Sequence, residues 1–293
     1  MCIIYKKGAA MEDFLSRFEY IRNLKQRVRI VGERSVPVEV GEPLLRERLM
    51  IVTMPDGTRR ATELIFPEKQ GTYPAVLFVH WYEPQEPVHN NRSQFREEAI
   101  RLANRGVVCL LVETMWSDLD WFYKRTQADD ELNTIRQVVE LRLWMDLLLA
   151  EPGVDARRFA YVGHDFGAMH AAILATVDPR PTAYVLMAGA PNFPDWYLYY
   201  PRLEGAEKDA YKDHMAPYDP CAHIGKLTNV PVLFQFGNND PHVPLPRAHD
   251  FFACAVEPKE MRFYEAGHGL NETAEKDRQL WLEAVLHAKL PPR

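Results

Sequence analysis

Three side chains in this sequence are of the types that could together carry out nucleophilic chemistry, namely Asp165, Asp240 and His268. Asp165 lies within residues 159–167, where a short apolar run enters a G-x-D-x-G turn and a helix-compatible run of small residues follows. A strand, a tight glycine turn and a helix are the context of a nucleophile elbow, whose central residue is usually serine. Aspartate at this position indicates a carboxylate nucleophile, which needs no base to activate it, whereas serine does.

Two glycines flank the candidate nucleophile. Gly163 and Gly167 lack the Cβ atoms that would clash where the strand and the helix crowd the turn. Asp165 would then project at the N-terminus of the helix, where free N–H groups and the helix dipole favour negative charge. We therefore expect Asp165 to be ionised at neutral pH. The alternative is that Asp165 serves only as a helix N-cap, for which aspartate is a preferred residue.

The candidate acid and base each follow a short apolar segment late in the chain. Asp240 lies in the loop after residues 231–237, and His268 lies between two glycines after residues 261–264. Both segments are typical of buried strands, and ligand sites in such sheets lie at the carboxyl ends of the strands. The order nucleophile, acid, histidine is that of α/β-hydrolases. Taken separately, Asp240 could simply cap its turn, and His268 could be an ordinary loop histidine.

On these motifs the chain resembles proteins of the α/β-hydrolase fold over residues 45–290. Its core is similar to the dienelactone-hydrolase-like branch at "PAVLFVHW" (74–81) and "REEAIRLANRGVVCLLVE" (96–113). In its aspartate nucleophile the chain instead resembles the haloalkane dehalogenases and epoxide hydrolases of the same fold. It departs from the usual H-G-G-G or H-G-x-P motif of the oxyanion loop, because a different sequence follows the first core strand.

That sequence is His80-Trp81-Tyr82, and it leaves the second oxyanion donor open. The backbone N–H of Phe166 is the expected first donor, because it directly follows the nucleophile. The second is expected from the backbone of Trp81 or Tyr82. His80 could orient this loop through a hydrogen bond, or it could be a satisfied histidine at the end of a strand.

The residue type of the nucleophile selects the substrate. A carboxylate that attacks an ester must expel an alkoxide far more basic than itself, which is unfavourable. Attack at a saturated carbon of an epoxide or alkyl halide gives a stable alkyl-enzyme ester, which His268, oriented by Asp240, can hydrolyse through an activated water. We expect a small, largely apolar electrophile, because an aromatic-rich segment at 191–230 interrupts the core strands where this fold often inserts a cap.

The choice between an epoxide and a halide depends on the leaving group. An epoxide needs an acid for its developing alkoxide, and the cap-like segment supplies tyrosines, of which Tyr197 and Tyr200 are the expected substrate-binding residues. Dehalogenases of this fold often place a tryptophan directly after the nucleophile, where this chain has Phe166, although Trp81 could compensate. The sequence therefore favours epoxide hydrolysis slightly.

Two other functions remain open. One is a dienelactone-hydrolase-like esterase or lactonase, in which Asp165 and His268 act as bases on water without a covalent step. The other is a non-catalytic ligand-binding protein that has kept the pocket and lost the nucleophile. An acid and a histidine in the right loops argue against the second alternative, since a binding pocket does not require them.

Hydrophobic periodicity predicts the elements that must position these residues. We expect residues 1–45 to form an N-terminal helix (11–28) and a linker (32–46), with the helix lying on the core or forming a dimer contact or lid. Residues 46–293 should form one α/β-hydrolase domain with a mostly parallel twisted sheet, helices on both faces and a short cap-like insertion at 191–230. It should begin with an antiparallel hairpin of 48–53 and 61–67 around Asp56-Gly57.

Composition and charge limit the classes of partner and cofactor that this chain is expected to bind. The formal charge of −6 and the pI near 6.0 argue against nucleic acid or an anionic membrane. The four cysteines are widely scattered and form no C-x-x-C motif, and no HExxH motif or stretch of transmembrane length occurs. We expect a cytoplasmic protein, since the start lacks a signal-peptide core. It should use a small-molecule substrate and water, without a metal or cofactor, and it could form a homodimer.

Overall fold

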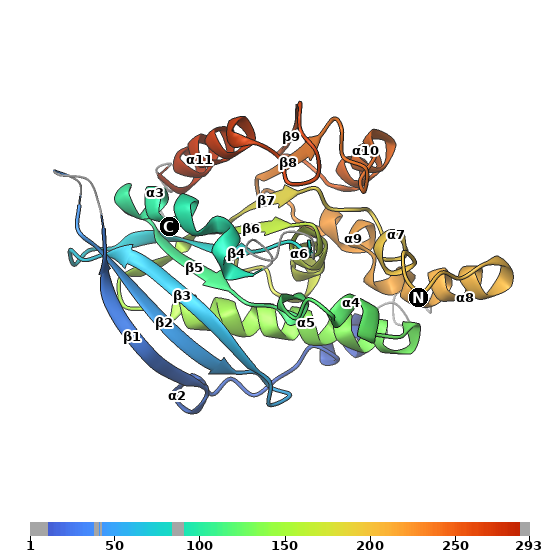
Figure 1. Ribbon diagram of the computed structural model, residues 1–293, viewed down its shortest axis with the longest axis horizontal. Coiled ribbons are helices and arrows are strands. Elements are labelled where there is room, and N and C mark those ends of the chain that lie inside the picture. The colour runs from blue at the N-terminus through green and yellow to red at the C-terminus, as the bar shows by residue number, and fades with distance from the viewer. Residues whose placement is uncertain (1–10, 38–40, 42, 84–90, 288–293) are drawn as a thin grey trace, which may run out of the picture.

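The computed structural model describes residues 11–37, 41, 43–83 and 91–287. They form one nine-stranded sheet with helices on both faces, in the strand order β1-β2-β3-β5-β4-β6-β7-β8-β9 (Figure 1). The strands are β1 (Val28–Val36), β2 (Leu45–Thr53), β3 (Arg59–Pro67), β4 (Tyr73–Val79), β5 (Val108–Val112), β6 (Val154–His164), β7 (Ala183–Met187), β8 (Val232–Gly237) and β9 (Lys259–Tyr264). Among these residues no helix combines the length and the apolarity that crossing a bilayer requires.

The sheet has an antiparallel part and a parallel part. Strands β1, β2, β3 and β5 pair antiparallel in succession, whereas β5, β4, β6, β7, β8 and β9 are mutually parallel. The antiparallel hairpin predicted around Asp56-Gly57 is confirmed as β2 and β3, and β1 extends it by a strand. The central strands are buried on both faces, which explains why their sequences are almost continuously apolar.

Helices cover the two faces of the sheet separately. Strand β4 sends Val76 and Phe78 to the face covered by α3 and α11, and Leu77 and Val79 to the face covered by α5 and α6 (Figure 1). This alternation follows from the two-residue period of a strand.

The helices of eight or more residues are α3 (Arg96–Asn104), α5 (Gln127–Leu149), α6 (Phe166–Val177), α8 (Gly205–Met215), α10 (Leu245–Cys254) and α11 (Glu272–His287). The shorter ones are α2 (Leu24–Arg27), α4 (Trp121–Lys124), α7 (Pro194–Tyr197) and α9 (Pro220–His223), together with single 3-10 turns.

The predicted helix over residues 11–28 is wrong beyond its first turns. The chain is helical at 11–16, then runs without regular structure to α2, and Val28 already begins β1. Phe18 is fully buried, and its carbonyl accepts a hydrogen bond from Arg142 of α5 at 2.7 Å. The backbone can therefore leave the helix without an unsatisfied carbonyl at this point. The predicted linker at 32–46 is also wrong at its start, because β1 extends to Val36, and the proposed boundary at residue 46 falls within β2.

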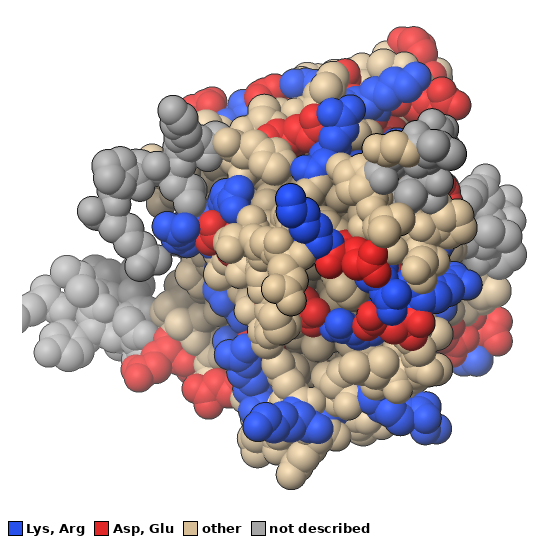
Figure 2. All heavy atoms as spheres, turned by 90° about the vertical axis from the view of Figure 1, so that its left-hand side faces the viewer, with Lys and Arg blue, Asp and Glu red and all other residues tan. Residues whose placement is uncertain are grey.

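Ion pairs cover the antiparallel end of the sheet. Glu47 accepts hydrogen bonds from Arg34 and from Arg96, and Glu63 accepts one from Arg96. Figure 2, which faces this end of the molecule, shows basic and acidic side chains interspersed rather than gathered by sign. Such a surface gives no single-sign patch that would attract a polyanion.

The insertion predicted at 191–230 contains the helices α7, α8 and α9, and a buried ion pair holds it to the rest of the molecule. Arg125, just after α4, pairs with both oxygens of Asp130 at 2.8 Å and donates to the carbonyl of Tyr200 at 2.7 Å. Tyr211 of α8 donates to the same carboxylate at 2.7 Å. The Arg125 guanidinium also lies 4.6 Å from the centre of the Tyr197 ring. One arginine therefore joins α5 to two segments of the cap.

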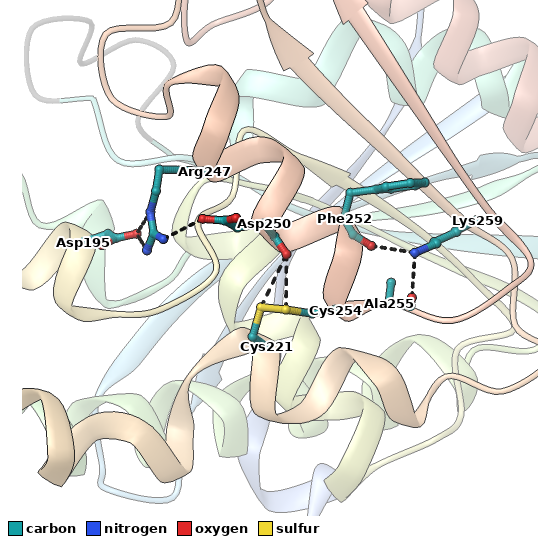
Figure 3. The surroundings of a disulfide bond; sticks show 8 residues. All are labelled: Asp195, Cys221, Arg247, Asp250, Phe252, Cys254, Ala255 and Lys259. Carbon is teal, nitrogen blue, oxygen red and sulfur yellow. Dashed lines mark hydrogen bonds and ion pairs between the residues drawn. A yellow bond between two sulfur atoms is a disulfide. The ribbon is translucent and has the colours of Figure 1, made fainter.

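A disulfide makes a second connection from the cap. Cys221 of α9 is bonded to Cys254 at the end of α10, and both sulfur atoms lie close to the carbonyl of Asp250 (Figure 3). Periodicity and spacing gave no sign of this pair, since 33 residues separate its members. The cytoplasm keeps most thiols reduced, so the disulfide counts against the expected cytoplasmic location, which stays a prediction.

We expect the substitution Asp130→Ala to lower the free energy of unfolding by about 3–5 kcal/mol, because it leaves the buried Arg125 charge without its partner. The matched control is Asp120→Ala, which removes the acid of an exposed pair with Lys124 and should cost less than about 1 kcal/mol. Urea denaturation of both variants measures the difference. Equal losses in the two variants would show that the buried pair does not hold the cap.

Candidate active site

The turn between β6 and α6 has the backbone geometry of a nucleophile elbow. Asp165 has a φ of 55° and a ψ of −117°, a backbone conformation that residues other than glycine rarely adopt. A Cβ atom on Gly163 would lie 2.5 Å from the carbonyl of Gly167, and one on Gly167 would lie 2.6 Å from the carbonyl of Val79. Both glycines are therefore required by close backbone approach, as the sequence predicted.

The acid and the histidine meet as expected from the chain order. Nδ1 of His268 lies 2.7 Å from Oδ2 of Asp240, and the other oxygen of Asp240 accepts the backbone N–H groups of His242 and Val243 at 2.8 and 3.1 Å. Asp240 is thus fixed by three donors, and it fixes the imidazole in turn. Nε2 of His268 is buried and has no hydrogen-bond partner among the described residues. The orientation leaves Nε2 as the atom that could exchange a proton with water or substrate.

The two oxygens of Asp165 have different surroundings. Oδ2 accepts the backbone N–H of Tyr82 at 3.1 Å. Oδ1 is buried and, within the described part of the chain, has no hydrogen-bond partner. The side chain does not accept a cap hydrogen bond from its own helix, so the alternative of a simple N-cap is not what the geometry shows. One oxygen is held by the oxyanion loop, and the other is available for chemistry.

The expectation that Asp165 is fully ionised at neutral pH is corrected by its burial. Burial raises the pKa of Asp165 to about 7, and nearby Asp240 adds to the rise. The charge of His268 and the backbone N–H groups of Tyr82 and Phe166 oppose the rise without cancelling it. The helix N-terminus and its amides are therefore outweighed by the loss of hydration. Near pH 7 a large fraction of Asp165 carries a proton.

The pKa values of Asp240 and His268 are both shifted from their ordinary values, because the two side chains face each other. Burial alone would raise the pKa of Asp240, but the hydrogen bond and charge of His268 and two backbone N–H groups hold it below its usual range. Burial alone would lower the pKa of His268, but the hydrogen bond that it donates to Asp240 and the charges of Asp165 and Asp240 raise it. His268 therefore lies between two carboxylates that favour its cationic form.

Of the two backbone N–H groups expected as the second oxyanion donor, that of Tyr82 contacts Asp165. The backbone N–H of Trp81 donates to Oε1 of Gln94 at 2.9 Å, so it is not the second donor, and the N–H of Tyr82 remains for that place. Nδ1 of His80 lies 2.7 Å from the carbonyl of Trp81, which places His80 where it orients the loop. Burial lowers the pKa of His80 to about 3, so this imidazole is neutral.

A stack of rings that the sequence did not reveal fixes the backbone of His268. His164, the residue before the nucleophile, has Nε2 2.9 Å from the carbonyl of His268 and Nδ1 2.6 Å from the amide nitrogen of Gln94. The indole of Trp81 stacks on His164 with a centroid distance of 4.7 Å and on His268 at 5.6 Å. Gln94 therefore joins the oxyanion loop to His164, which in turn contacts the carbonyl of His268. Nothing local in the sequence marks Gln94, because its two partners lie in other segments.

A pocket of about 200 Å³ lies against His268, whereas Asp165 and Asp240 are not among the residues that line it. It is lined by Tyr82, Glu83, Phe122, Tyr123, Trp196, Tyr199, His242 and His268. Of the two cap tyrosines predicted for substrate binding, neither lines it. The hydroxyl of Tyr197 lies 3.2 Å from Thr134 Oγ1, away from the pocket, and Tyr200 packs on Tyr123 at the surface. Tyr199, between them, does line the pocket.

Trp196 is a second residue of the aromatic-rich segment 191–230 that lines the pocket. Its ring lies 5.3 Å from that of His268 and 5.8 Å from that of Phe166, so it bridges the cap and the elbow. Its Nε1 is buried without a hydrogen-bond partner within the described ranges. Across those same ranges no group of three His, Cys, Asp or Glu side chains is placed to hold a metal ion.

Comparison with known proteins establishes the fold of this chain but no family or sequence relationship. No family model and no curated protein matches the sequence. An acetyl xylan esterase from Paenibacillus sp. R4 is similar in structure with a TM-score of 0.73 at 14% identity, over 97% of this chain and 93% of that one. Acetyl xylan esterase 1 from Thermoanaerobacterium sp. JW/SL YS485 gives 0.69 at 14% identity, over 95% and 94%.

A third similar structure comes from Klebsiella pneumoniae subsp. pneumoniae MGH 78578 and is provisionally named a dienelactone hydrolase. Its TM-score is 0.57 at 18% identity, over 89% of this chain and 99% of that one. The chain therefore has the α/β-hydrolase fold, as its motifs indicated.

The raised pKa of Asp165 predicts a pH-dependent gain in stability from the neutral substitution Asp165→Asn. The folded state favours the protonated carboxyl, so the stability that this group contributes is present at low pH and is lost as the pH rises through about 7. The variant should therefore gain stability relative to wild type by about 2–3 kcal/mol more at pH 8 than at pH 5. Urea denaturation at both pH values measures this.

The control is Asp240→Asn, for which the sign is opposite. The folded pKa of Asp240 is lowered, so its carboxylate contributes stability that is present at neutral pH and is lost on acidification. This change lies below the ordinary carboxyl pKa of about 3.9, so Asp240→Asn should become more costly as the pH rises toward about 4 and, through this group, should change little between pH 5 and pH 8. The assignment of a buried, proton-holding Asp165 is wrong if both variants respond to pH in the same direction.

Proposed function

We propose that this protein is a hydrolase in which Asp165 attacks a small, largely apolar electrophile and forms an alkyl-enzyme ester. The observation that carries the proposal is the difference between the two oxygens of this carboxylate. Oδ2 is held by the N–H of Tyr82, whereas Oδ1 has no partner in the described part of the chain. Oδ1 is thus the attacking oxygen, and Oδ2 already lies where an oxyanion forms in the second step.

In the first step, Oδ1 attacks a saturated carbon that bears an epoxide oxygen or a halide. A new carbon–oxygen bond joins the substrate to Asp165, and the bond from carbon to its leaving group breaks. A halide departs as the ion, whereas an epoxide oxygen stays attached and takes a proton from an acid. This step needs the ionised form of Asp165, whose fraction grows as the pH rises through about 7, the raised pKa of this group. His268 is not needed as a base, because the ionised carboxylate is itself the nucleophile.

In the second step, Nε2 of His268 removes a proton from water, and the resulting hydroxide attacks Cγ of the Asp165 ester. The negative charge forms on Oδ2, where the N–H groups of Tyr82 and Phe166 stabilise it. Collapse breaks the Cγ–Oδ1 bond, so Oδ1 leaves on the substrate carbon, and the proton held by His268 goes to Oδ1. The product is an alcohol or a vicinal diol, and the carboxylate of Asp165 is regenerated with one oxygen from water.

The choice between epoxide and halide rests on two residues of the cap. Tyr199 lines the pocket, and burial together with the charge of Asp195 raises its pKa, which keeps it protonated at neutral pH as an acid for an epoxide oxygen. Trp196 offers an indole N–H without a partner within the described ranges, as a leaving halide would need. We favour the epoxide, because Tyr123 lines the same pocket and offers a second hydroxyl.

A second candidate is an esterase or lactonase in which Asp165 and His268 act as bases on water. Its support is the structural similarity to two acetyl xylan esterases over nearly the whole chain. Against it, the N–H of Tyr82 that would bind a substrate carbonyl oxygen already binds Asp165. The remaining alternative, a ligand-binding protein without turnover, does not explain why His268 is hydrogen-bonded to Asp240.

The substitution His268→Gln should trap the ester, because it removes the base of the second step and leaves the first step intact. After incubation with small epoxides and alkyl halides, intact mass and peptide mapping should locate one substrate-sized adduct on Asp165. The matched control is the double variant Asp165→Asn/His268→Gln, which should carry none. Wild-type protein in ¹⁸O-water should, in a single turnover, place the heavy oxygen in Asp165 and not in the product.

Two outcomes would contradict the covalent mechanism. Turnover of model esters or lactones without an adduct, with ¹⁸O going directly into the product, would establish the water-base alternative. Ligand binding without turnover or adduct formation across epoxides, halides, esters and lactones would favour the binding protein.

The substitutions Tyr199→Phe and Trp196→Phe should separate the two substrate classes. If Tyr199 is the acid, Tyr199→Phe lowers the rate of epoxide opening at least about 100-fold and leaves halide displacement nearly unchanged. Trp196→Phe should have the opposite selectivity. The rates are those of adduct formation in the His268→Gln background, so that the second step does not interfere. Equal losses for both substrates in both variants would mean that these residues only shape the pocket.

A further inference from the structure

A second cavity opens in the cap, next to the catalytic pocket. It has a volume of about 440 Å³, lies between α7 and α8, and shares Tyr199 with the catalytic pocket. We call this cavity the cap groove. Because one side chain lines both cavities, a ligand longer than the catalytic pocket of about 200 Å³ would extend past Tyr199 into the cap groove.

Three cations line the cap groove. Arg202 precedes α8, and Lys208 and Lys212 lie one turn apart on it, so they share a face of the helix. None of the three side chains makes a hydrogen bond or ion pair with any residue in the described ranges, whereas most other arginines of the fold do. The acids of the fold do not neutralise them, although the chain as a whole carries a charge of −6.

The two acids that line the cap groove do not remove its positive charge. Asp195 is already bound by Arg247 of α10, which also pairs with Asp250 (Figure 3). Glu204 is the other acid. The three cations of the lining outnumber its two carboxylates, and Asp195 is also paired with Arg247, so the cap groove has a net positive charge that favours an anion.

The rest of the lining is apolar. Leu198, directly before Tyr199, and Leu203, directly after Arg202, line the cap groove, and Pro194 at the start of α7 adds a third apolar side chain. An aliphatic chain can pack on these residues while its end reaches the charged side chains. The chemistry of the cap groove therefore matches an anionic group at the end of an aliphatic arm.

We propose that the cap groove binds a carboxylate or phosphate carried on an aliphatic arm of the substrate, whose electrophilic carbon enters the catalytic pocket. The link to the electrophile rests on the function proposed for Asp165, whereas the binding of the anion does not. The natural substrate is then an epoxide or halide of an aliphatic acid or phosphate ester, rather than a neutral hydrocarbon.

Binding is tested first, without any reaction. Pentanoate, pentyl phosphate and the neutral isostere pentanamide are titrated against wild-type protein by nuclear magnetic resonance. At least one anion should bind about tenfold more tightly than the amide, and the comparison of the two anions identifies the preferred group. The triple variant Arg202→Gln/Lys208→Gln/Lys212→Gln should lose this preference. The control variant Lys25→Gln/Arg29→Gln/Arg105→Gln, which changes the net charge equally at exposed positions elsewhere, should keep it.

Reaction is tested in the His268→Gln background. A terminal epoxide and an alkyl bromide, each with an ω-carboxylate arm or the corresponding primary amide, are compared by the rate of adduct formation on Asp165. The ratio of anionic to neutral rates should fall about tenfold in the triple variant and stay constant in the control variant. The salt dependence of that ratio should fall with it, because exposed charges are screened.

The outcomes separate this inference from the proposed function. If both arms react equally and the triple variant changes nothing, the inference is overturned while the Asp165 mechanism stands. If no probe forms an adduct, the Asp165 mechanism fails, and the titrations alone decide whether the cap groove is an anion site. Equal affinity of wild-type protein for the anions and for pentanamide overturns it in either case.

Discussion

The active site depends on one close backbone approach, that of α6 to the ends of β4 and β6. A hydrogen atom fits between Gly167 and the carbonyl of Val79, but a methyl group does not. This contact sets the left-handed conformation of Asp165 and brings the loop after β4 over the carboxylate, where Tyr82 donates its N–H. The proposed nucleophile and its proposed oxyanion donor are thus positioned by the same packing. Because both belong to central strands of one sheet, little conformational freedom remains between them.

Burial then determines the electrostatics of the site. Asp165 lies among aromatic rings and without water-facing surface, which raises its pKa, while Asp240 is held ionised by three donors. His268 lies between the two carboxylates, and its backbone is fixed by His164. Two aspartates on one histidine therefore differ in protonation because their environments differ, a common way to separate the roles of like groups. The site acts as a coupled unit rather than as three independent side chains.

The cap converts this general arrangement into a specific pocket. Arg125, the disulfide of Cys221 and the pairing of Asp195 with Arg247 fix the insertion at three places. Rigid attachment matters here because Trp196 and Tyr199, which face His268 and His242, come from the insertion rather than from the sheet. The pocket is lined by residues of two parts of the fold, the sheet with its connecting segments and the cap, and each part is anchored separately. Substitutions in the cap could therefore change substrate preference without disturbing the elbow.

The sequence by itself determined what depends on neighbours along the chain. Glycines around Asp165, apolar runs and the order of Asp165, Asp240 and His268 are local patterns, so they gave the elbow, the central strands and the placement of the acid and base. The tertiary structure alone decided what depends on distances between remote segments. Examples are the contact of Tyr82 rather than Trp81 with Asp165, the position of Tyr199 rather than Tyr197 or Tyr200 at the pocket, the raised pKa of Asp165 and the disulfide. Strand β1 belongs with them: its seven central residues are exposed and carry no buried stripe, so only its hydrogen bonds to β2 make it a strand. Local periodicity reports which side of an element is buried, whereas hydration, charge and hydrogen-bond partners are set by whatever the rest of the fold brings to that side.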